Sequence, residues 1–184
     1  MEKMLGVVMC GGQSQRMGTD KGLIPQGNAT WAQLIYNKLI ALNIPVVISI
    51  NQTQNTDYST LFNANDLVTD VMDIPGPLNG ILSVHASHPD KDILILACDM
   101  IDMDNQTLQQ LINTYQSDPD SDFYAYHNGQ FFEPLCAIYT AKGLNTLKLS
   151  GLKNYSLQHV LNSAGTIKLE VLNINAFKNQ NSKE

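Results

Sequence analysis

The segment from Gly11 to Lys21 concentrates residue types that bind phosphate groups. It reads GGQSQRMGTDK. Glycines let backbone N–H groups approach phosphate oxygens, Arg16 offers a planar fork of donors, and Lys21 offers a point charge. The segment fits neither GxxxxGK[ST] nor GxGxxG, so the common P-loop and dinucleotide fingerprints are excluded here. Composition alone leaves two interpretations open: a polyphosphate-binding loop, and a glycine turn with two solvated cations.

Asp99 is a second candidate for chemistry, because it directly follows the apolar run at residues 93–98. Magnesium sites commonly use one or two carboxylates together with substrate phosphate oxygens, and a carboxylate at the end of a buried strand is well placed for this. An aspartate at the end of a strand is also often a turn former or a helix cap. Both interpretations of Asp99 stay open at this point.

The elements that must position these residues follow an α/β pattern. We expect apolar strands at 5–10, 46–50 and 93–98, a weaker strand at 66–71, and helices at 31–42, 78–85 and 104–116. Strands that are apolar along their full length are typical of a parallel sheet. The sequence therefore predicts an α/β fold with a mostly parallel, doubly wound, Rossmann-like sheet and helices on both faces. Ligands of such sheets bind beyond the carboxyl ends of the strands, where residues 11–21 and Asp99 lie.

The second half of the chain has a different pattern. Residues 123–126 and 131–139 flank an Asn-Gly pair, the strongest short signal for an antiparallel hairpin. A helix at 157–164 and a strand at 167–172 should follow. With no linker in the sequence, we expect one domain over residues 1–177 and a polar tail over residues 178–184.

Composition excludes several functional classes. The chain has 184 residues, with 11 Lys+Arg against 17 Asp+Glu and a net charge of −6, whereas nucleic-acid binding needs a basic surface. No apolar run approaches the roughly 20 residues that span a bilayer. The three cysteines form no CxxC pair, which is not the pattern of a disulfide framework or zinc site. We expect a cytoplasmic protein that binds neither nucleic acid nor membrane.

Residues 9–21 resemble the L-x-G-G-x-x-x-R-M-G-x-D-K signature of nucleotidyltransferases of the molybdenum cofactor guanylyltransferase type. Three further matches follow in the expected order: PGPLNG at 75–80, Cys-Asp at 98–99 and EPLCAIY at 133–139. The Asn-x-Asn at 173–175 resembles the N-x-N-T-P element of that family. Together the matches span nearly the whole chain, and the first is long enough to be specific.

The resemblance implies three groups of site residues. Arg16, Lys21 and Asp99 would be catalytic, with Asp99 as the Mg²⁺ ligand. Backbone groups and polar side chains would bind the nucleotide: Met9, Cys10, Gly11, Gly12, Lys21, Ser49, Asn51, Asp70 and Asp99. Four residues would face the acceptor substrate: Pro77, Leu78, Asn173 and Asn175. The chain departs from the family in having Cys10 for alanine, Ser49 for asparagine and Ala176-Phe177 for Thr-Pro.

The implied reaction is Mg²⁺-dependent transfer of GMP from GTP to the terminal phosphate of molybdopterin or Mo-molybdopterin, with release of pyrophosphate. A phosphate monoester has a second pKa of roughly 6, so the nucleophile is already mostly dianionic and needs no histidine or cysteine base. The enzyme must align two anions and screen their charge. Maturation proteins of molybdoenzymes are further expected partners.

Two alternatives remain open from the sequence. A related nucleotidyltransferase could use CTP or UTP with another phosphorylated acceptor. A non-catalytic protein could bind nucleotide or deliver cofactor, although the intact Arg16, Lys21 and Asp99 favour catalysis. A dinucleotide oxidoreductase is disfavoured because GxGxxG does not occur.

Overall fold

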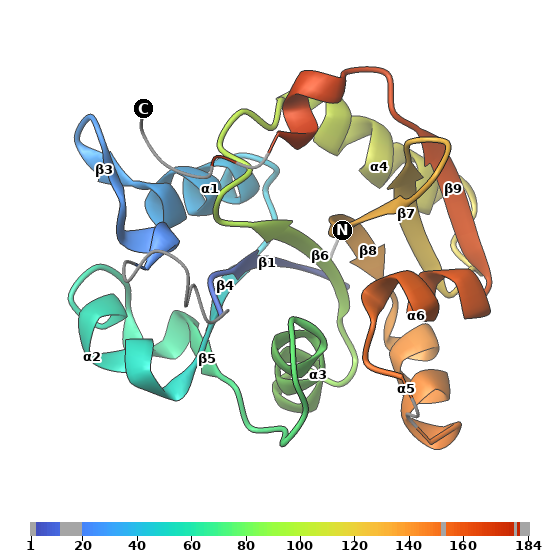
Figure 1. Cartoon of the computed structure of the whole chain (residues 1–184), viewed down its shortest axis with the longest axis horizontal. Helices are drawn as coiled ribbons and strands as arrows, with labels where there is room; N and C mark the ends of the chain where they lie inside the picture. The colour runs from blue at the N-terminus through green and yellow to red at the C-terminus, as the bar shows by residue number, and fades with distance from the viewer. Residues whose placement is uncertain (1–2, 12–19, 152–153, 179, 181–184) are drawn as a thin grey trace.

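The computed structural model describes residues 3–11, 20–151, 154–178 and 180. Within this part, one sheet has seven strands in the order β5-β4-β1-β6-β8-β7-β9 (Figure 1). The strands are β1 (Met4–Met9), β4 (Val46–Ile50), β5 (Leu67–Thr69), β6 (Asp92–Ala97), β7 (Phe123–His127), β8 (Phe132–Tyr139) and β9 (Thr166–Glu170). A separate two-stranded sheet pairs β2 (Pro25–Gln26) with β3 (Ala29–Thr30).

Strand direction decides which edge of the large sheet can carry a site. β1 pairs in parallel with both β4 and β6, and β4 pairs in parallel with β5. β8 is antiparallel to β6 and to β7, while β9 is parallel to β7. Six of these strands therefore run the same way, and their carboxyl ends share one edge. The predicted mostly parallel sheet and the predicted hairpin at 123–139 are both confirmed.

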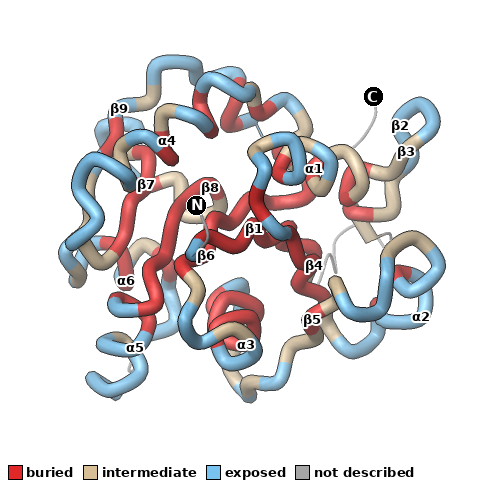
Figure 2. The backbone as a smooth tube through the Cα atoms, turned by 180° about the vertical axis from the view of Figure 1, so that it is seen from behind, coloured by how far each residue is buried: buried red, intermediate tan, exposed pale blue. Residues whose placement is uncertain are grey.

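Helices cover both faces of the sheet, as predicted (Figure 1). One apolar core lies under α1 (Trp31–Ile40), α2 (Asn55–Tyr58) and α4 (Asn105–Ser117). The other lies under α3 (Leu78–Ser87), α5 (Ala141–Leu149) and α6 (Leu157–Ser163). β1, β4 and β6 are buried along their full length (Figure 2), because alternate side chains enter the two cores. This explains their apolar sequences, which lack alternation.

Local sequence signals account for where several elements begin. Thr30 and Gln33 form a capping box at the start of α1, and the Asp104 side chain caps α4 by accepting from Thr107 N. Short 3₁₀ turns complete the fold: η1 (Lys21–Leu23), η2 (Gln52–Gln54), η3 (Ala64–Asp66) and η4 (Ile174–Phe177). The sequence analysis missed α2, α5 and the β2–β3 sheet. α5 contains only a short apolar pattern, interrupted by Gly143, so its helix depends on packing.

The two residues that replace Thr-Pro in the last motif are part of the core. Ala176 is 1% exposed, and Phe177 packs edge-on against Tyr126 with ring centroids 5.0 Å apart. Gln180, in the predicted polar tail, donates from its backbone to the Asp99 carbonyl at 3.1 Å.

No helix in the part of the chain described here has the length and apolar character needed to cross a membrane.

Phe177→Ala should lower the free energy of unfolding by about 3 kcal/mol, because it leaves a cavity against Tyr126. Urea denaturation measures this change. Leu172→Ala is the matched control, since Leu172 is 72% exposed and its truncation should change the stability by less than about 0.5 kcal/mol. Equal effects of the two substitutions would contradict a core role for Phe177.

Candidate functional site

One cavity lies beyond the carboxyl ends of β1, β4 and β5, against the start of α3. Its volume is about 660 Å³, and its lining includes Gly11, Asn51, Asp70, Pro77 and Gly80. Ligand sites for small molecules typically measure roughly 300–1,000 Å³ and occur at this edge of α/β sheets. We call it the β4–α3 cavity. It brings together four of the predicted ligand-contacting residues: Gly11, Asn51, Asp70 and Pro77.

The end of β1 is held in place by its neighbours. The N–H groups of Cys10 and Gly11 both donate to the Ser49 carbonyl, at 2.9 and 3.0 Å, and the Met9 carbonyl accepts from Cys98 N at 3.1 Å. The side chains of Met9 and Cys10 are buried in the two cores. Gly11 lines the cavity, whereas Gly12 lies outside the described residues.

Ser49 is fully buried behind the cavity wall. Its side-chain hydroxyl has no hydrogen-bond partner within the described structure and lies against Gly80 of α3. A Cβ on Gly80 would overlap this hydroxyl and approach the Met9 methyl carbon to 2.9 Å. Glycine at position 80 therefore lets α3 pack tightly behind the cavity.

Asp70 presents an unusual carboxylate. It directly follows β5, and its backbone N–H donates to Ile50 O at 2.9 Å. The Oδ1 atom is buried without a hydrogen-bond partner among the described residues, and burial raises the pKa of this carboxyl group. An acceptor that the protein leaves unsatisfied at a cavity wall can accept a hydrogen bond from a ligand N–H or O–H group.

The loop between Asp70 and α3 is held by the Asn79 side chain. The Asn79 side chain accepts from Met72 N at 3.1 Å and donates to Met72 O at 2.7 Å. Ser83 Oγ donates to Asn79 Oδ1 and accepts from Val71 N. Asn79 therefore shapes the loop beside Asp70. Leu78, a predicted substrate contact, lies fully buried in the core.

Asn51 ends the β4 side of the same cavity. Its side-chain Oδ1 caps η2 by accepting from Thr53 N at 2.9 Å and Gln54 N at 3.2 Å. The sequence analysis proposed Asn51 as a nucleotide contact. The structure places it at the cavity and also gives it this capping role.

Lys21 and Asp99 form an ion pair, with 2.8 Å between Nζ and Oδ2. Their side chains are 23% and 14% exposed. Lys21 begins η1, and Asp99 follows β6, the neighbour of β1 in the sheet. Two of the three predicted catalytic residues are thus in contact, although 78 positions separate them in sequence. The third, Arg16, lies outside the described residues.

The donor set at Asp99 fits magnesium rather than zinc. Among the residues that the structure describes, no group of three or more His, Cys, Asp and Glu side chains could hold a metal ion. A single carboxylate supplies hard oxygen ligands, which suits an ion that keeps several waters and completes its shell with substrate phosphates. The Asp99 carboxylate would supply one oxygen ligand of this kind.

The predicted acceptor-side residues Asn173 and Asn175 are exposed and lie at η4. Asn173 Nδ2 donates to Asp104 Oδ2 at 2.7 Å, and its Oδ1 accepts from Asn175 N. Burial alone would raise the pKa of Asp104, but the hydrogen bonds from Thr107 and Asn173 lower it overall. The Asn173–Asp104 bond thus attaches η4 to the start of α4.

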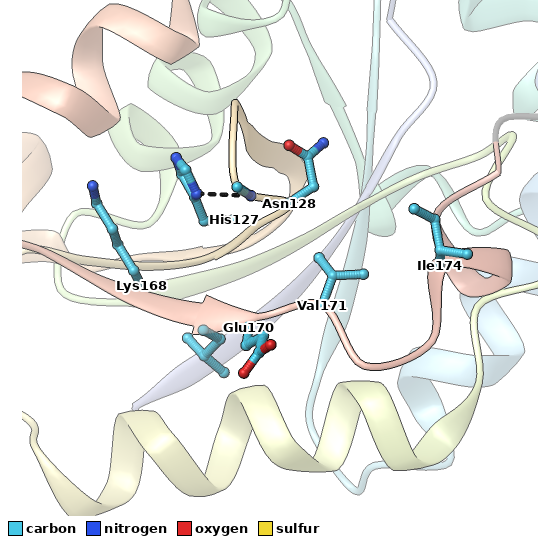
Figure 3. Close-up of a pocket in the computed structure, with 8 residues that line it drawn as sticks. His127, Asn128, Lys168, Glu170, Val171 and Ile174 are labelled. Atoms are coloured by element: carbon cyan, nitrogen blue, oxygen red, sulfur yellow. Dashed lines mark hydrogen bonds between the residues drawn. The ribbon is translucent and has the colours of Figure 1, made fainter.

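A second cavity, of about 400 Å³, lies at the carboxyl ends of β7 and β9 (Figure 3). His127, Lys168 and Glu170 line it together with Ile174, the residue between Asn173 and Asn175. His127 and Lys168 extend to the same side of the two strands (Figure 3). Lys168 Nζ stands 5.3 Å from the Phe132 ring centroid. We call this the β7–β9 cavity.

Sequence reasoning missed Lys168. Its signal was that residues 154–177 contain no other Lys or Arg, but only the structure shows that it lines the cavity at the carboxyl ends of β7 and β9.

Comparison with known proteins identifies the family. The model of the MobA-like NTP transferase domain matches residues 6–167, well over half of the chain. The chain belongs to this family. It is therefore a nucleotidyltransferase, and the resemblance to this family that the sequence indicated is confirmed.

Individual relatives agree with this assignment. A probable molybdenum cofactor guanylyltransferase of Flavobacterium johnsoniae is 27% identical over 180 residues, covering 97% of this chain and 90% of that protein. A molybdenum cofactor biosynthesis bifunctional protein of Synechocystis is 33% identical over 77% of this chain, which spans 40% of that longer protein. The fold matches the crystal structure of molybdopterin-guanine dinucleotide biosynthesis protein A from Archaeoglobus fulgidus, with a TM-score of 0.76 and 18% identity over 97% of this chain and 92% of that one.

Asp70→Asn should stabilise the ligand-free protein at pH 7 while weakening its binding of ligand. Because burial raises the pKa of Asp70, the folded state binds this proton more tightly than the unfolded state. The carboxylate therefore costs stability above the raised pKa, and this cost disappears below the ordinary pKa of about 3.9. Urea denaturation should show a gain for Asp70→Asn at pH 7 that shrinks as the pH is lowered to about 4.

The control for this comparison is Asp57→Asn, which removes an exposed carboxylate on α2. It should leave both stability and ligand binding near those of the wild type. A loss of stability at pH 7 for Asp70→Asn would show that its carboxylate is satisfied in the ligand-free protein.

Proposed function

We propose that this nucleotidyltransferase transfers GMP from GTP to the terminal phosphate of molybdopterin, giving a guanine dinucleotide cofactor and pyrophosphate. The Lys21–Asp99 pair carries the proposal. It joins a cation and a candidate Mg²⁺ ligand next to the end of β1, and Gly11, two residues beyond that strand, lines the β4–α3 cavity. The named relatives supply the choice of guanine and of the molybdenum cofactor.

The nucleotide would occupy the β4–α3 cavity. Asp70 Oδ1 would accept a hydrogen bond from the nucleoside, which would satisfy an oxygen that is otherwise buried without a partner. Lys21 would exchange part of its contact with Asp99 for a phosphate oxygen, so its charge would stay at the reacting groups. Asp99 would hold Mg²⁺, which when bound supplies charge screening and Lewis-acid polarisation of the phosphates.

The acceptor would approach from the β7–β9 cavity. The carboxyl ends of β7 and β9 lie on the same edge of the sheet as Asp99, so a phosphate held there can be directed towards the nucleotide. Lys168 supplies a cation, and Asn173 and Asn175 flank Ile174 at the lining. Alignment of two anions by fixed donors accounts for the catalysis, because the dianionic acceptor needs no base.

Incubating the protein with Mg²⁺, GTP and molybdopterin tests the proposal. We expect pyrophosphate release and a guanine dinucleotide product, with little of either when CTP, UTP or ATP replaces GTP. Product from CTP or UTP with another phosphorylated acceptor would establish the related nucleotidyltransferase instead. Binding of GTP without turnover of any tested pair would favour the nucleotide-binding delivery protein.

Arg16→Ala, Lys21→Ala and Asp99→Ala should each lower the turnover by roughly 100-fold, the usual loss for one charge-stabilising group. The Asp99→Ala variant should also lose its response to added Mg²⁺. Steady-state pyrophosphate release measures both effects. Lys148→Ala and Asp90→Ala remove exposed charges of each sign elsewhere and should retain normal rates. Near-normal transfer by Lys21→Ala would contradict its role at the phosphates.

Lys168→Ala should raise the KM for molybdopterin by about tenfold without changing the KM for GTP, because it removes one charged contact of the acceptor alone. Initial rates with each substrate varied in turn separate the two constants. Lys148→Ala again serves as the charge control. An increase in the KM for GTP would assign Lys168 to the nucleotide instead.

A further inference from the structure

Gln54 contacts residues at both ends of the glycine-rich segment. Its Nε2 atom donates to the Cys10 carbonyl at 3.0 Å and to Asp20 Oδ2 at 2.6 Å. Its Oε1 atom accepts from Asn51 N at 2.8 Å. The side chain is 8% exposed. Two donated bonds and one accepted bond on a buried side chain require an amide, since a carboxylate could not donate either bond.

Asp20 is the residue that this amide fixes. Its Oδ1 accepts from Gly22 N at 2.9 Å, which caps η1, and from the Tyr58 hydroxyl at 3.1 Å. Tyr58 is fully buried, and a Cβ on Gly22 would overlap its hydroxyl. The Asp20 carboxylate therefore receives hydrogen bonds from three elements: η1, η2 and α2.

The Asp20 carboxylate directly precedes Lys21, one member of the Lys21–Asp99 pair, in the sequence. Lys21 follows Asp20 directly, begins η1 and bonds Asp99 at 2.8 Å. The three neutral donors occupy both oxygens of Asp20 and hold the start of η1 against the end of β1. Without these hydrogen bonds, the Asp20 carboxylate would compete with Asp99 and with phosphate for the Lys21 ammonium group.

We propose that Gln54 is a positioning residue for the transfer reaction. It fixes Asp20 relative to the Cys10 carbonyl, and through η1 it keeps Lys21 directed at Asp99. Gln54 acts through Lys21 and need not touch substrate itself. This inference rests on the proposed function, because it assigns Lys21 to the phosphates of the nucleotide.

Gln54→Ala should lower kcat by about tenfold, the scale of a lost hydrogen bond to a charged group, while the KM for the acceptor stays unchanged. The matched control is Asn55→Ala, which removes an exposed amide from the next residue and should behave as wild type. Thermal unfolding of both variants shows whether they are folded at the assay temperature.

Combining Gln54→Ala with Lys21→Ala distinguishes positioning from general destabilisation. If Gln54 acts through Lys21, its removal should change kcat and the affinity for Mg²⁺-GTP by less than about twofold once Lys21 is already alanine. If Gln54→Ala lowered kcat by a further factor of about ten in the Lys21→Ala background, the proposal would be overturned. A Gln54→Ala variant with wild-type kcat would also overturn it.

Gln54→Glu provides a second variant of nearly the same shape. It keeps the acceptor for Asn51 N but places a carboxylate beside the Asp20 carboxylate and the Cys10 carbonyl, which repel it. The decrease in kcat at about pH 8 should therefore exceed that of Gln54→Ala. Tyr58, the Cys10 and Cys98 thiols and the Lys21 ammonium group also lie near this point. Burial raises the pKa values of Tyr58 and Cys10, so neither ionises in this range.

Lowering the pH should therefore restore activity to Gln54→Glu relative to wild type, because the two carboxyl groups can share a proton and re-form the hydrogen bond. Gln54→Ala should show no such recovery. An unchanged ratio of Gln54→Glu to wild-type activity between about pH 8 and pH 6 would contradict the assigned contact with Asp20.

Hydrogen–deuterium exchange of the ligand-free protein tests the positioning independently of the substrate. Gln54→Ala should speed exchange in the peptide over residues 20–24, which contains the Gly22 amide, and Asn55→Ala should not. If this holds while wild type transfers no GMP, the positioning of Asp20 stands and the proposed function fails. If wild type transfers GMP but exchange is unaffected by Gln54→Ala, the function stands and the positioning role fails.

Discussion

The adjacency of β1 and β6 in the middle of the sheet is the constraint on which the site depends. Their ladder pairs Met9 with Ala97, and Cys98 N continues it by donating to Met9 O. The residues that follow these two strands must therefore emerge side by side. This brings Gly11 near Asp99. It also lets Lys21, the first residue of η1, form its ion pair with the Asp99 carboxylate. The β4–α3 cavity and the Lys21–Asp99 pair thus have one origin in strand pairing.

Around this centre, polar side chains divide into those that have hydrogen-bond partners within the described structure and those that have none. The Asn79 amide is hydrogen-bonded to the backbone of Met72. The Gln54 amide donates to the Cys10 carbonyl and to the Asp20 carboxylate. Asp70 Oδ1 and Ser49 Oγ are buried without partners among the described residues. A preorganised binding site combines rigid supports with an acceptor that has no partner in the protein. Burying that acceptor without a hydrogen bond lowers the stability of the ligand-free state.

Electrostatics explain why a few cations matter so much in this chain. The net charge is −6, so the overall field repels the anionic ligands proposed for it. Lys21 and Lys168 lie at the ligand-binding edge of the sheet, and the single arginine of the chain, Arg16, belongs to the segment that joins Gly11 to Lys21. Attraction must therefore be local, and screening by a metal at Asp99 would complete it.

The sequence by itself determined the strands, the main helices and the hairpin, and it singled out Lys21 and Asp99 as candidate residues for binding phosphate and metal. These follow from local patterns: apolar runs, the Asn-Gly turn, and a motif whose residue types suit phosphate. Only the tertiary structure showed that Leu78 and Phe177 belong to the core, that Asn173 bonds Asp104, that Gln54 bonds Asp20, and that Lys168 lines a cavity. The physical reason is distance along the chain. Such contacts depend on strand order and direction, which are set by burying two cores at once and leave no mark in the residues nearby.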